Sequence, residues 1–87
     1  MPTASGSNYR NDSEAATYKN LGGNSGVESY QIQTDRIIVT FTTGAVYTYS
    51  NDSCGADNVE IMKGLARQGQ GLNSYIMLND EVYSGYE

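Results

Sequence analysis

The sulfur nucleophile of the sequence is Cys54, which lies in the polar segment 50–57. A reactive cysteine needs a neighbouring base or a lowered thiol pKa, and histidine is the usual base. The sequence has no histidine, and the nearest charged residues along the chain, Asp52 and Asp57, are acids that raise the pKa of a thiol. We therefore expect Cys54 to be a plain thiol and the protein to be non-catalytic.

The same region carries oxygen ligands of the kind that calcium binds, on Asp52, Asp57 and Glu60. Their spacing differs from the acidic loop D-x-[DN]-x-[DN]-G that holds calcium in EF-hands. One cysteine and no histidine also leave out the ligand set of a structural zinc site. The sequence predicts neither a metal ion nor a cofactor.

The charge balance is acidic, with ten Asp and Glu against five Lys and Arg and a net charge of −5. A nucleic-acid-binding surface usually clusters basic residues that neutralise phosphates, and here the basic residues are scattered singly. Direct binding of nucleic acid is therefore not expected. An acidic surface attracts a basic protein partner.

Tyrosine dominates the aromatic residues, with eight Tyr against one Phe and no Trp. Tyrosine suits protein interfaces and also the wet edges of small cores. Near the end of the sequence, tyrosines alternate with acids, which is typical of a protein-docking strip. The residues predicted to bind a basic protein partner are Asp80, Glu81, Tyr83, Tyr86 and Glu87, helped by Asp52, Asp57 and Glu60. For Tyr9 and Tyr18 a role at an interface and a structural role are both open.

Three strands precede these residues. Segments 28–34, 36–42 and 45–50 alternate apolar and polar residues with the period of a half-buried strand. Thr43-Gly44 is the predicted turn before the last of them, with a positive φ at Gly44. Tyr47 and Tyr49 lie one residue apart and must point to the same side of the sheet, where we expect them, with Tyr30, to fill the core.

Two helices follow a predicted loop at 50–57. Asp57 is expected to cap the first helix, with Glu60 reaching back to complete a capping box, and Gly69 to end it. A shorter helix from Leu72 to about Leu78 would present apolar residues, among them Tyr75, to the sheet. The predicted fold class is α+β, a three-stranded antiparallel meander packed against two short helices.

Residues 1–26 are polar and rich in Ser, Asn, Gly and Thr. Such a segment buries too little apolar surface to offset its ordering entropy, so we expect a flexible arm before a single domain over residues 27–87. A short helix around Asp12–Asn20 is the alternative. The start, Met1 to Gly6, lacks the basic and apolar regions of a signal peptide, and no apolar run approaches the roughly 20 residues that span a bilayer, so we expect a cytoplasmic protein without a membrane partner.

Three short motifs occur in a recognisable order: 39-VTFTTG-44, then 47-YTY-49, then a helix and glycine segment that ends in 72-LNSYI-76. This order resembles the KTSC domain, a small family found at the C-terminus of some lysyl-tRNA synthetases and as single-domain bacterial and phage proteins. The resemblance covers about residues 27–83. It departs from the family in lacking a Val-Pro after the second tyrosine and in having Gln68 and Met77 where Ser and Arg are common.

Two functions follow from these patterns. The leading hypothesis is a non-catalytic, acidic protein-binding module, and its narrower form is a phage-type inhibitor that imitates nucleic acid on a basic nuclease. The alternative, implied by the KTSC resemblance, is a single-stranded RNA-binding module. It would stack bases on exposed tyrosines and contact phosphates through Arg36, Lys63 and Arg67.

Overall fold

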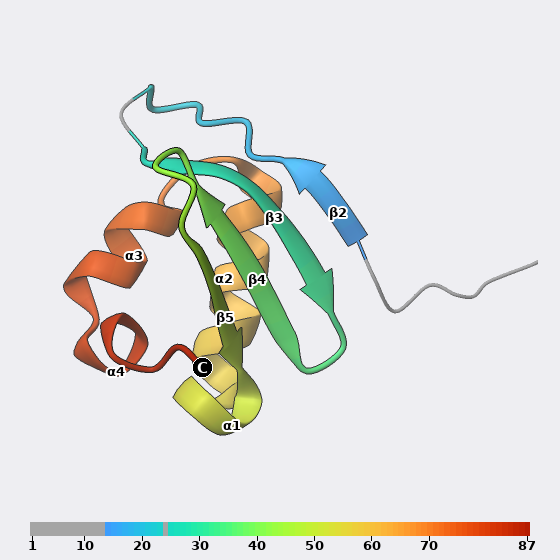
Figure 1. Cartoon of the computed structure of the whole chain (residues 1–87), viewed down its shortest axis with the longest axis vertical. Coiled ribbons are helices and arrows are strands. Elements are labelled where there is room, and N and C mark those ends of the chain that lie inside the picture. The colour runs from blue at the N-terminus through green and yellow to red at the C-terminus, as the bar shows by residue number, and fades with distance from the viewer. Residues whose placement is uncertain (1–13, 24) are drawn as a thin grey trace, which may run out of the picture.

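The computed structural model describes residues 14–23 and 25–87, and within them an antiparallel sheet of four strands in the order β2-β3-β4-β5 (Figure 1). The strands are β2 (Glu14–Thr17), β3 (Val27–Gln33), β4 (Arg36–Phe41) and β5 (Val46–Ser50). The α+β class and the meander β3-β4-β5 are confirmed. The fourth strand, β2, was not predicted.

The register of the meander explains which side chains enter the core. Ile32 lies opposite Ile37, and Ile37 lies opposite Tyr49 on the next strand. Directly paired residues point to the same face of a sheet, so these side chains form one apolar row. Gly44 turns β4 into β5 at a φ of 94°, which confirms the predicted positive φ.

The strand β2 corrects the expectation of a flexible arm or a short helix before Val27. Glu14 pairs with Ile32 and Thr17 with Ser29, so β2 extends the sheet beyond β3. The Glu14 carboxylate also lies 3.0 Å from the guanidinium of Arg67. Residues 1–13, with Tyr9, lie outside the described part of the chain.

The predicted loop at 50–57 is also corrected, because it contains the short helix α1 (Asn51–Cys54). Ser50 caps α1 through its hydroxyl, which accepts from the Ser53 backbone N–H at 3.1 Å, while the Ser53 hydroxyl accepts from the Ser50 N–H at 2.9 Å. This reciprocal pair is a capping box built from two serines.

The long helix α2 (Ala56–Gln68) begins and ends at glycines. Its N-cap is Gly55, without a side-chain cap, so the predicted capping box of Asp57 and Glu60 is wrong. Asp57 lies in the first turn, where a negative charge is favourable. Gly69 ends the helix, as predicted, and it does so in the left-handed conformation.

Two shorter helices close the chain. The helix α3 (Leu72–Leu78) matches the predicted bounds and buries Leu72 and Ile76. It is followed by α4 (Asp80–Tyr83), which was not predicted and buries Val82. The side chain of Asn79 caps α4 by accepting from the Glu81 N–H.

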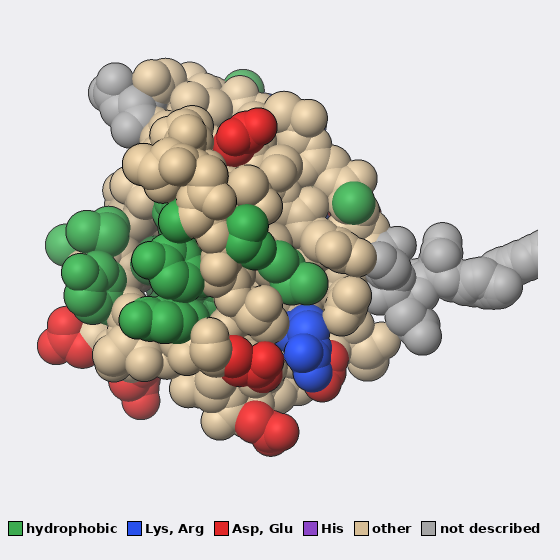
Figure 2. All heavy atoms as spheres, viewed as in Figure 1, with side chains coloured by type: hydrophobic (Ala, Val, Ile, Leu, Met, Phe, Trp, Pro, Cys, Tyr) green, Lys and Arg blue, Asp and Glu red, His purple; other side chains and the backbone are tan. Residues whose placement is uncertain are grey.

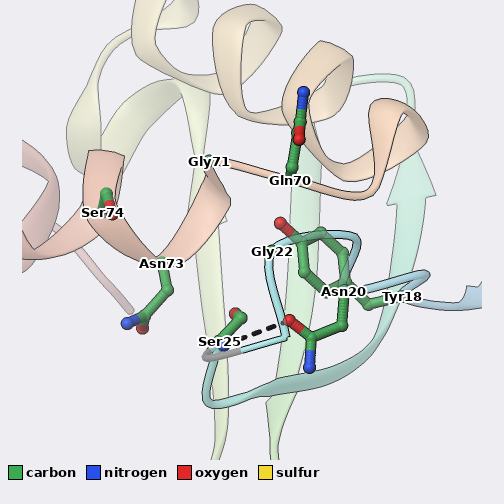
Figure 3. Close-up of a pocket in the computed structure, with 8 residues that line it drawn as sticks. All are labelled: Tyr18, Asn20, Gly22, Ser25, Gln70, Gly71, Asn73 and Ser74. Carbon is green, nitrogen blue, oxygen red and sulfur yellow. Dashed lines mark hydrogen bonds between the residues drawn. The ribbon is translucent and has the colours of Figure 1, made fainter.

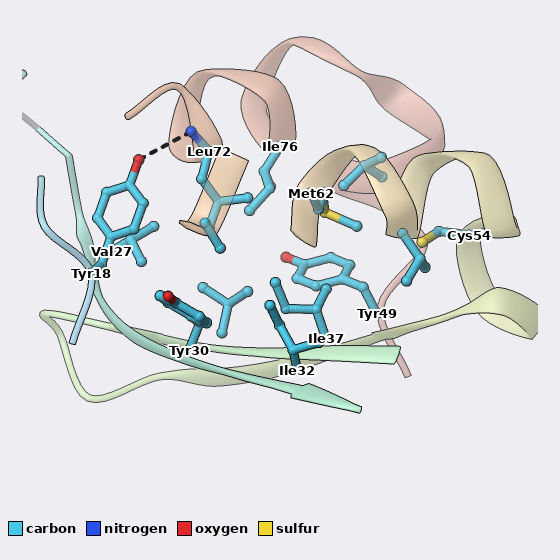
Figure 4. Close-up of a cluster of buried hydrophobic side chains, with 14 residues drawn as sticks. Tyr18, Val27, Tyr30, Ile32, Ile37, Tyr49, Cys54, Met62, Leu72 and Ile76 are labelled. Carbon is cyan, nitrogen blue, oxygen red and sulfur yellow. Dashed lines mark hydrogen bonds between the residues drawn. The ribbon is translucent and has the colours of Figure 1, made fainter. Parts of the chain in front are cut away.

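The core lies between the sheet and the helices (Figure 4). Tyr30 and Tyr49 are buried in it, as predicted. Tyr18, for which an interface role was left open, is also buried and its hydroxyl accepts from the Leu72 N–H at 3.2 Å. The segment between β2 and β3 is thereby fixed to the start of α3. Among the described residues, no helix is long and apolar enough to cross a bilayer.

Candidate functional site: an aromatic groove beside strand β5

A groove of about 500 Å³ opens between β5 on one side and α3, α4 and the residues after α4 on the other. Its aromatic lining is contributed by Phe41, Tyr47, Tyr49, Tyr83 and Tyr86. Ile76 and Met77 of α3 add aliphatic surface. Figure 2 shows hydrophobic side chains gathered on this face over β5 and beside α3 and α4. We call this feature the aromatic groove.

Tyr47 lines the groove because the elements that pack on this face of β5 bury Tyr49 but do not extend over Tyr47. The two rings share one face of β5, yet Tyr49 is 2% exposed and Tyr47 is 36% exposed. The expectation that both fill the core is therefore correct for Tyr49 and wrong for Tyr47. The Tyr47 ring instead contacts Tyr86 at a centroid distance of 4.7 Å and Phe41, in an edge-to-face arrangement, at a centroid distance of 5.6 Å.

Residues 84–87 bring Tyr86 to this position by running along the outer edge of β5. The Glu87 N–H donates to the Thr48 carbonyl at 2.8 Å, and the Glu87 carboxylate lies 3.6 Å from the Arg36 guanidinium. Gly85 packs so closely that an added Cβ would overlap the Glu81 carbonyl oxygen and lie 2.6 Å from the Cβ of Cys54. The segment is thus held by the packing of Gly85, by the ring contact of Tyr86 and by the hydrogen bond and ion pair of Glu87.

The acids of the predicted docking set take up different positions. Asp80 and Glu81 occupy the first turn of α4, just before the groove residue Tyr83, and Glu87 follows the groove residue Tyr86. In Figure 2 acidic side chains lie along the lower side of the hydrophobic cluster. Among residues 14–23 and 25–87, no charged residue lines the groove itself.

The remaining acids of that set lie on other elements. Asp52 is on α1, and its charge helps to raise the pKa of Arg36, although the hydrogen bonds that Arg36 donates to Asp35 and the charges of Asp35 and Glu87 contribute more. Asp57 and Glu60 are on α2, the helix behind the sheet in Figure 1, and do not line the groove. The structure therefore brings Tyr83 and Tyr86 together with Tyr47, and it leaves Asp57 and Glu60 apart from them.

The three basic residues proposed to contact RNA are all engaged with acids. Arg36 donates to the carboxylate of Asp35 and so lowers the pKa of that carboxyl group. Arg67 is paired with Glu14. Lys63 is only 5% exposed, and its Nζ donates to the Thr34 carbonyl at 2.9 Å and to the Glu60 carboxylate at 3.0 Å.

Cys54 is buried where α1 meets residue Gly85. Burial raises the pKa of its thiol, with a smaller contribution from the charge of Glu81, while a hydrogen bond with Ser53 acts in the opposite direction. The predicted direction is confirmed, but its main cause is burial rather than the acids at 52 and 57. Within the described part of the chain, no three His, Cys, Asp or Glu side chains are placed to share a metal ion.

A second, smaller pocket of about 210 Å³ lies between the segment after β2 and the start of α3 (Figure 3). Its lining is polar and uncharged, with amide and hydroxyl groups such as those of Asn20, Ser25 and Asn73. The Asn20 carbonyl oxygen accepts from the Ser25 N–H at 3.1 Å, and the Tyr18 hydroxyl is bonded to Leu72. These contacts hold the connection between β2 and β3, which is a structural role.

Comparison of the chain with models of known protein families, with curated proteins and with solved structures gives no match. The KTSC resemblance therefore stays a prediction that depends on the sequence motifs alone. In the structure, the YTY motif supplies one core ring, Tyr49, and one groove ring, Tyr47.

Proposed function

We propose that this protein is a non-catalytic protein-binding module that docks a basic segment of a partner in the aromatic groove. The observation that carries the proposal is the convergence of Tyr47, Tyr83 and Tyr86, which are 36%, 56% and 48% exposed, next to acids of α4 and Glu87. Exposed tyrosines in a hollow offer large contact area with little side-chain entropy to lose. The acids beside them favour a partner of opposite charge.

A narrower form of the proposal concerns a partner whose basic surface normally binds nucleic acid. The net charge of −5 and the acids along one side of the groove face would let the protein occupy such a surface in place of phosphates. The protein would then release bound nucleic acid from that partner, as an inhibitor of a nuclease does.

Selection of short random peptides on the immobilised protein tests the proposal. We expect the selected peptides to be enriched in Arg and Lys and to bind the Tyr83→Ser variant about ten-fold more weakly than the wild type. Val46→Ser is the matched control, because Val46 is equally exposed and lies on β5 but outside the groove lining. Peptides without basic enrichment, or equal loss in both variants, would overturn the proposal.

An electrophoretic mobility shift assay with mixed-sequence RNA at low salt distinguishes the RNA-binding alternative from the protein-binding proposal. Base stacking would use the same rings, whereas Lys63 is buried and Arg36 and Arg67 are paired with acids. We expect no shift at about 50 µM binding sites, near the weakest non-specific affinity of an RNA-binding protein. A shift that is lost in Tyr83→Ser would favour RNA as the ligand of the groove.

A further inference from the structure

The lining of the aromatic groove combines aromatic rings with hydroxyl and backbone groups, and none of the described residues that form it carries a cationic side chain. Arg36, which contacts Glu87 beside the groove residue Tyr86, does not line the groove and is paired with Asp35 and Glu87. A positively charged group entering the groove would therefore meet no repelling charge from the lining. It would meet the negative faces of aromatic rings.

The geometry of the rings limits how such a group can bind. The Tyr47 and Tyr86 rings are 4.7 Å apart at their centroids and tilted by 53°, which leaves no room for a group between them. A ligand must lie on the ring faces that are turned to the solvent, with Tyr83 as a third ring. Because the Tyr47 and Tyr86 rings are inclined to each other, a flat group can stack on one of them and contact the other with its edge.

The acids near the groove attract a cation without chelating it. Asp80, Glu81 and Glu87 adjoin the groove residues Tyr83 and Tyr86 along the chain, but none of them lines the groove. Burial also raises the pKa of Tyr49, in the groove wall, to about 12, so its phenol stays neutral. A weakly hydrated cation therefore suits this site better than a strongly hydrated one, because the groove replaces water with rings rather than carboxylates.

We propose that the aromatic groove is an arginine-binding site, in which the guanidinium of a partner's arginine stacks on the exposed face of one tyrosine and contacts the neighbouring rings with its edge, within the set Tyr47, Tyr83 and Tyr86. Guanidinium is planar and weakly hydrated and stacks on aromatic faces, which an ammonium group does less well. This inference rests on the proposed function and specifies the side chain that the basic partner would insert.

The test uses three capped peptides that differ in one side chain: acetyl-Gly-Arg-Gly-amide, its lysine analogue and its citrulline analogue. Citrulline has the shape of arginine without the charge. Titrations followed by NMR should shift the signals of Tyr47, Tyr83 and Tyr86, with arginine binding about five-fold more tightly than citrulline. Equal affinities for arginine and citrulline, or shifts confined to residues outside the groove, would overturn the inference, and equal affinities for arginine and lysine would overturn the choice of guanidinium.

Paired substitutions at Tyr83 separate a ring effect from a loss of structure. Tyr83→Phe keeps the aromatic face and should keep the arginine affinity within about two-fold, whereas Tyr83→Leu keeps apolar bulk and should lose about five-fold. An apolar groove without cation recognition would treat the two variants alike. If the selected peptides bind the protein but tolerate replacement of arginine by citrulline, the protein-binding function stands and the arginine site fails. If the arginine peptide binds the groove and no selected peptide does, the site stands and the proposed function fails.

Discussion

Single residues show how one strand supplies both core and site. Tyr47 and Tyr49 have the same direction on β5, but only Tyr49 lies in the core cluster with Met62 and Ile37. Tyr47 is nearer the turn at Gly44, where the groove replaces the helical cover. Residue type and alternation therefore determine which face of β5 a tyrosine occupies. How far the helices extend over that face determines whether the ring is buried in the core or exposed in the groove.

Ionisation of Tyr49 should destabilise the fold at alkaline pH. Burial raises the pKa of Tyr49 from its ordinary value of 10.0 to about 12, with smaller contributions from Tyr47, Cys54 and Tyr86. The stabilisation is complete below pH 10 and is lost as the pH rises toward 12, because the unfolded chain ionises first. It amounts to on the order of 2 kcal/mol.

The measurement compares urea unfolding of the wild type and of Tyr49→Phe at about pH 9 and about pH 11. The variant keeps the ring and should lose less stability than the wild type over this interval. A Tyr49→Phe variant that loses as much as the wild type would show that the phenol of Tyr49 is not the group responsible.

At the scale of elements, the strands and helices with a periodic apolar pattern were predicted from the sequence. An element that forms because of contacts with residues distant in the sequence was missed. The strands β3, β4 and β5 and the helix α3 carry clear apolar periods, so their bounds were predicted to within a few residues. β2 reads Glu-Ala-Ala-Thr, without alternation, and becomes a strand because β3 pairs with it and the following Tyr18 is buried. The helix α1 depends on two serines that also suit a turn.

Two glycines on different elements should respond oppositely to alanine. Gly64 lies in the middle of α2, where an added Cβ has nothing within 4 Å, so Gly64→Ala should stabilise the fold by about 0.5–1 kcal/mol. Gly85→Ala should instead lift residues 84–87 from α1, because the Cβ would overlap Glu81 and approach Cys54. Tyr86 would then leave Tyr47.

Thermal unfolding and arginine-peptide titration of both variants check this pair. Gly64→Ala should unfold at a higher temperature with an unchanged affinity for the peptide. Gly85→Ala should lower both the unfolding temperature and the affinity. Unchanged binding by Gly85→Ala would mean that the contact of Tyr86 with Tyr47 is dispensable for the site.

For the whole molecule, the groove exists only once the chain is folded. Its rings come from β4, β5, α4 and the segment after α4, and the contact of Tyr47 with Tyr86 joins residues far apart in the sequence. The alternation of tyrosines with acids was enough to predict that Tyr83 and Tyr86 are exposed. It could not predict Tyr47 as their neighbour, because that pairing depends on how residues 84–87 return to the edge of β5.

Removal of the edge strand β2 should lower the stability of the fold without changing the affinity of the groove, which lies beside the other edge strand, β5. A chain of residues 26–87, the domain predicted from the sequence with Gly26 of the groove lining kept, lacks β2 and Tyr18 and leaves β3 as an exposed edge. Loss of a buried aromatic side chain alone costs about 3–5 kcal/mol, so this chain should unfold at a much lower urea concentration than residues 14–87. Equal midpoints would show that β2 and Tyr18 contribute little. The groove lies at the opposite edge, beside β5, so whatever fraction of the shorter chain is folded should bind the arginine peptide with the affinity of residues 14–87.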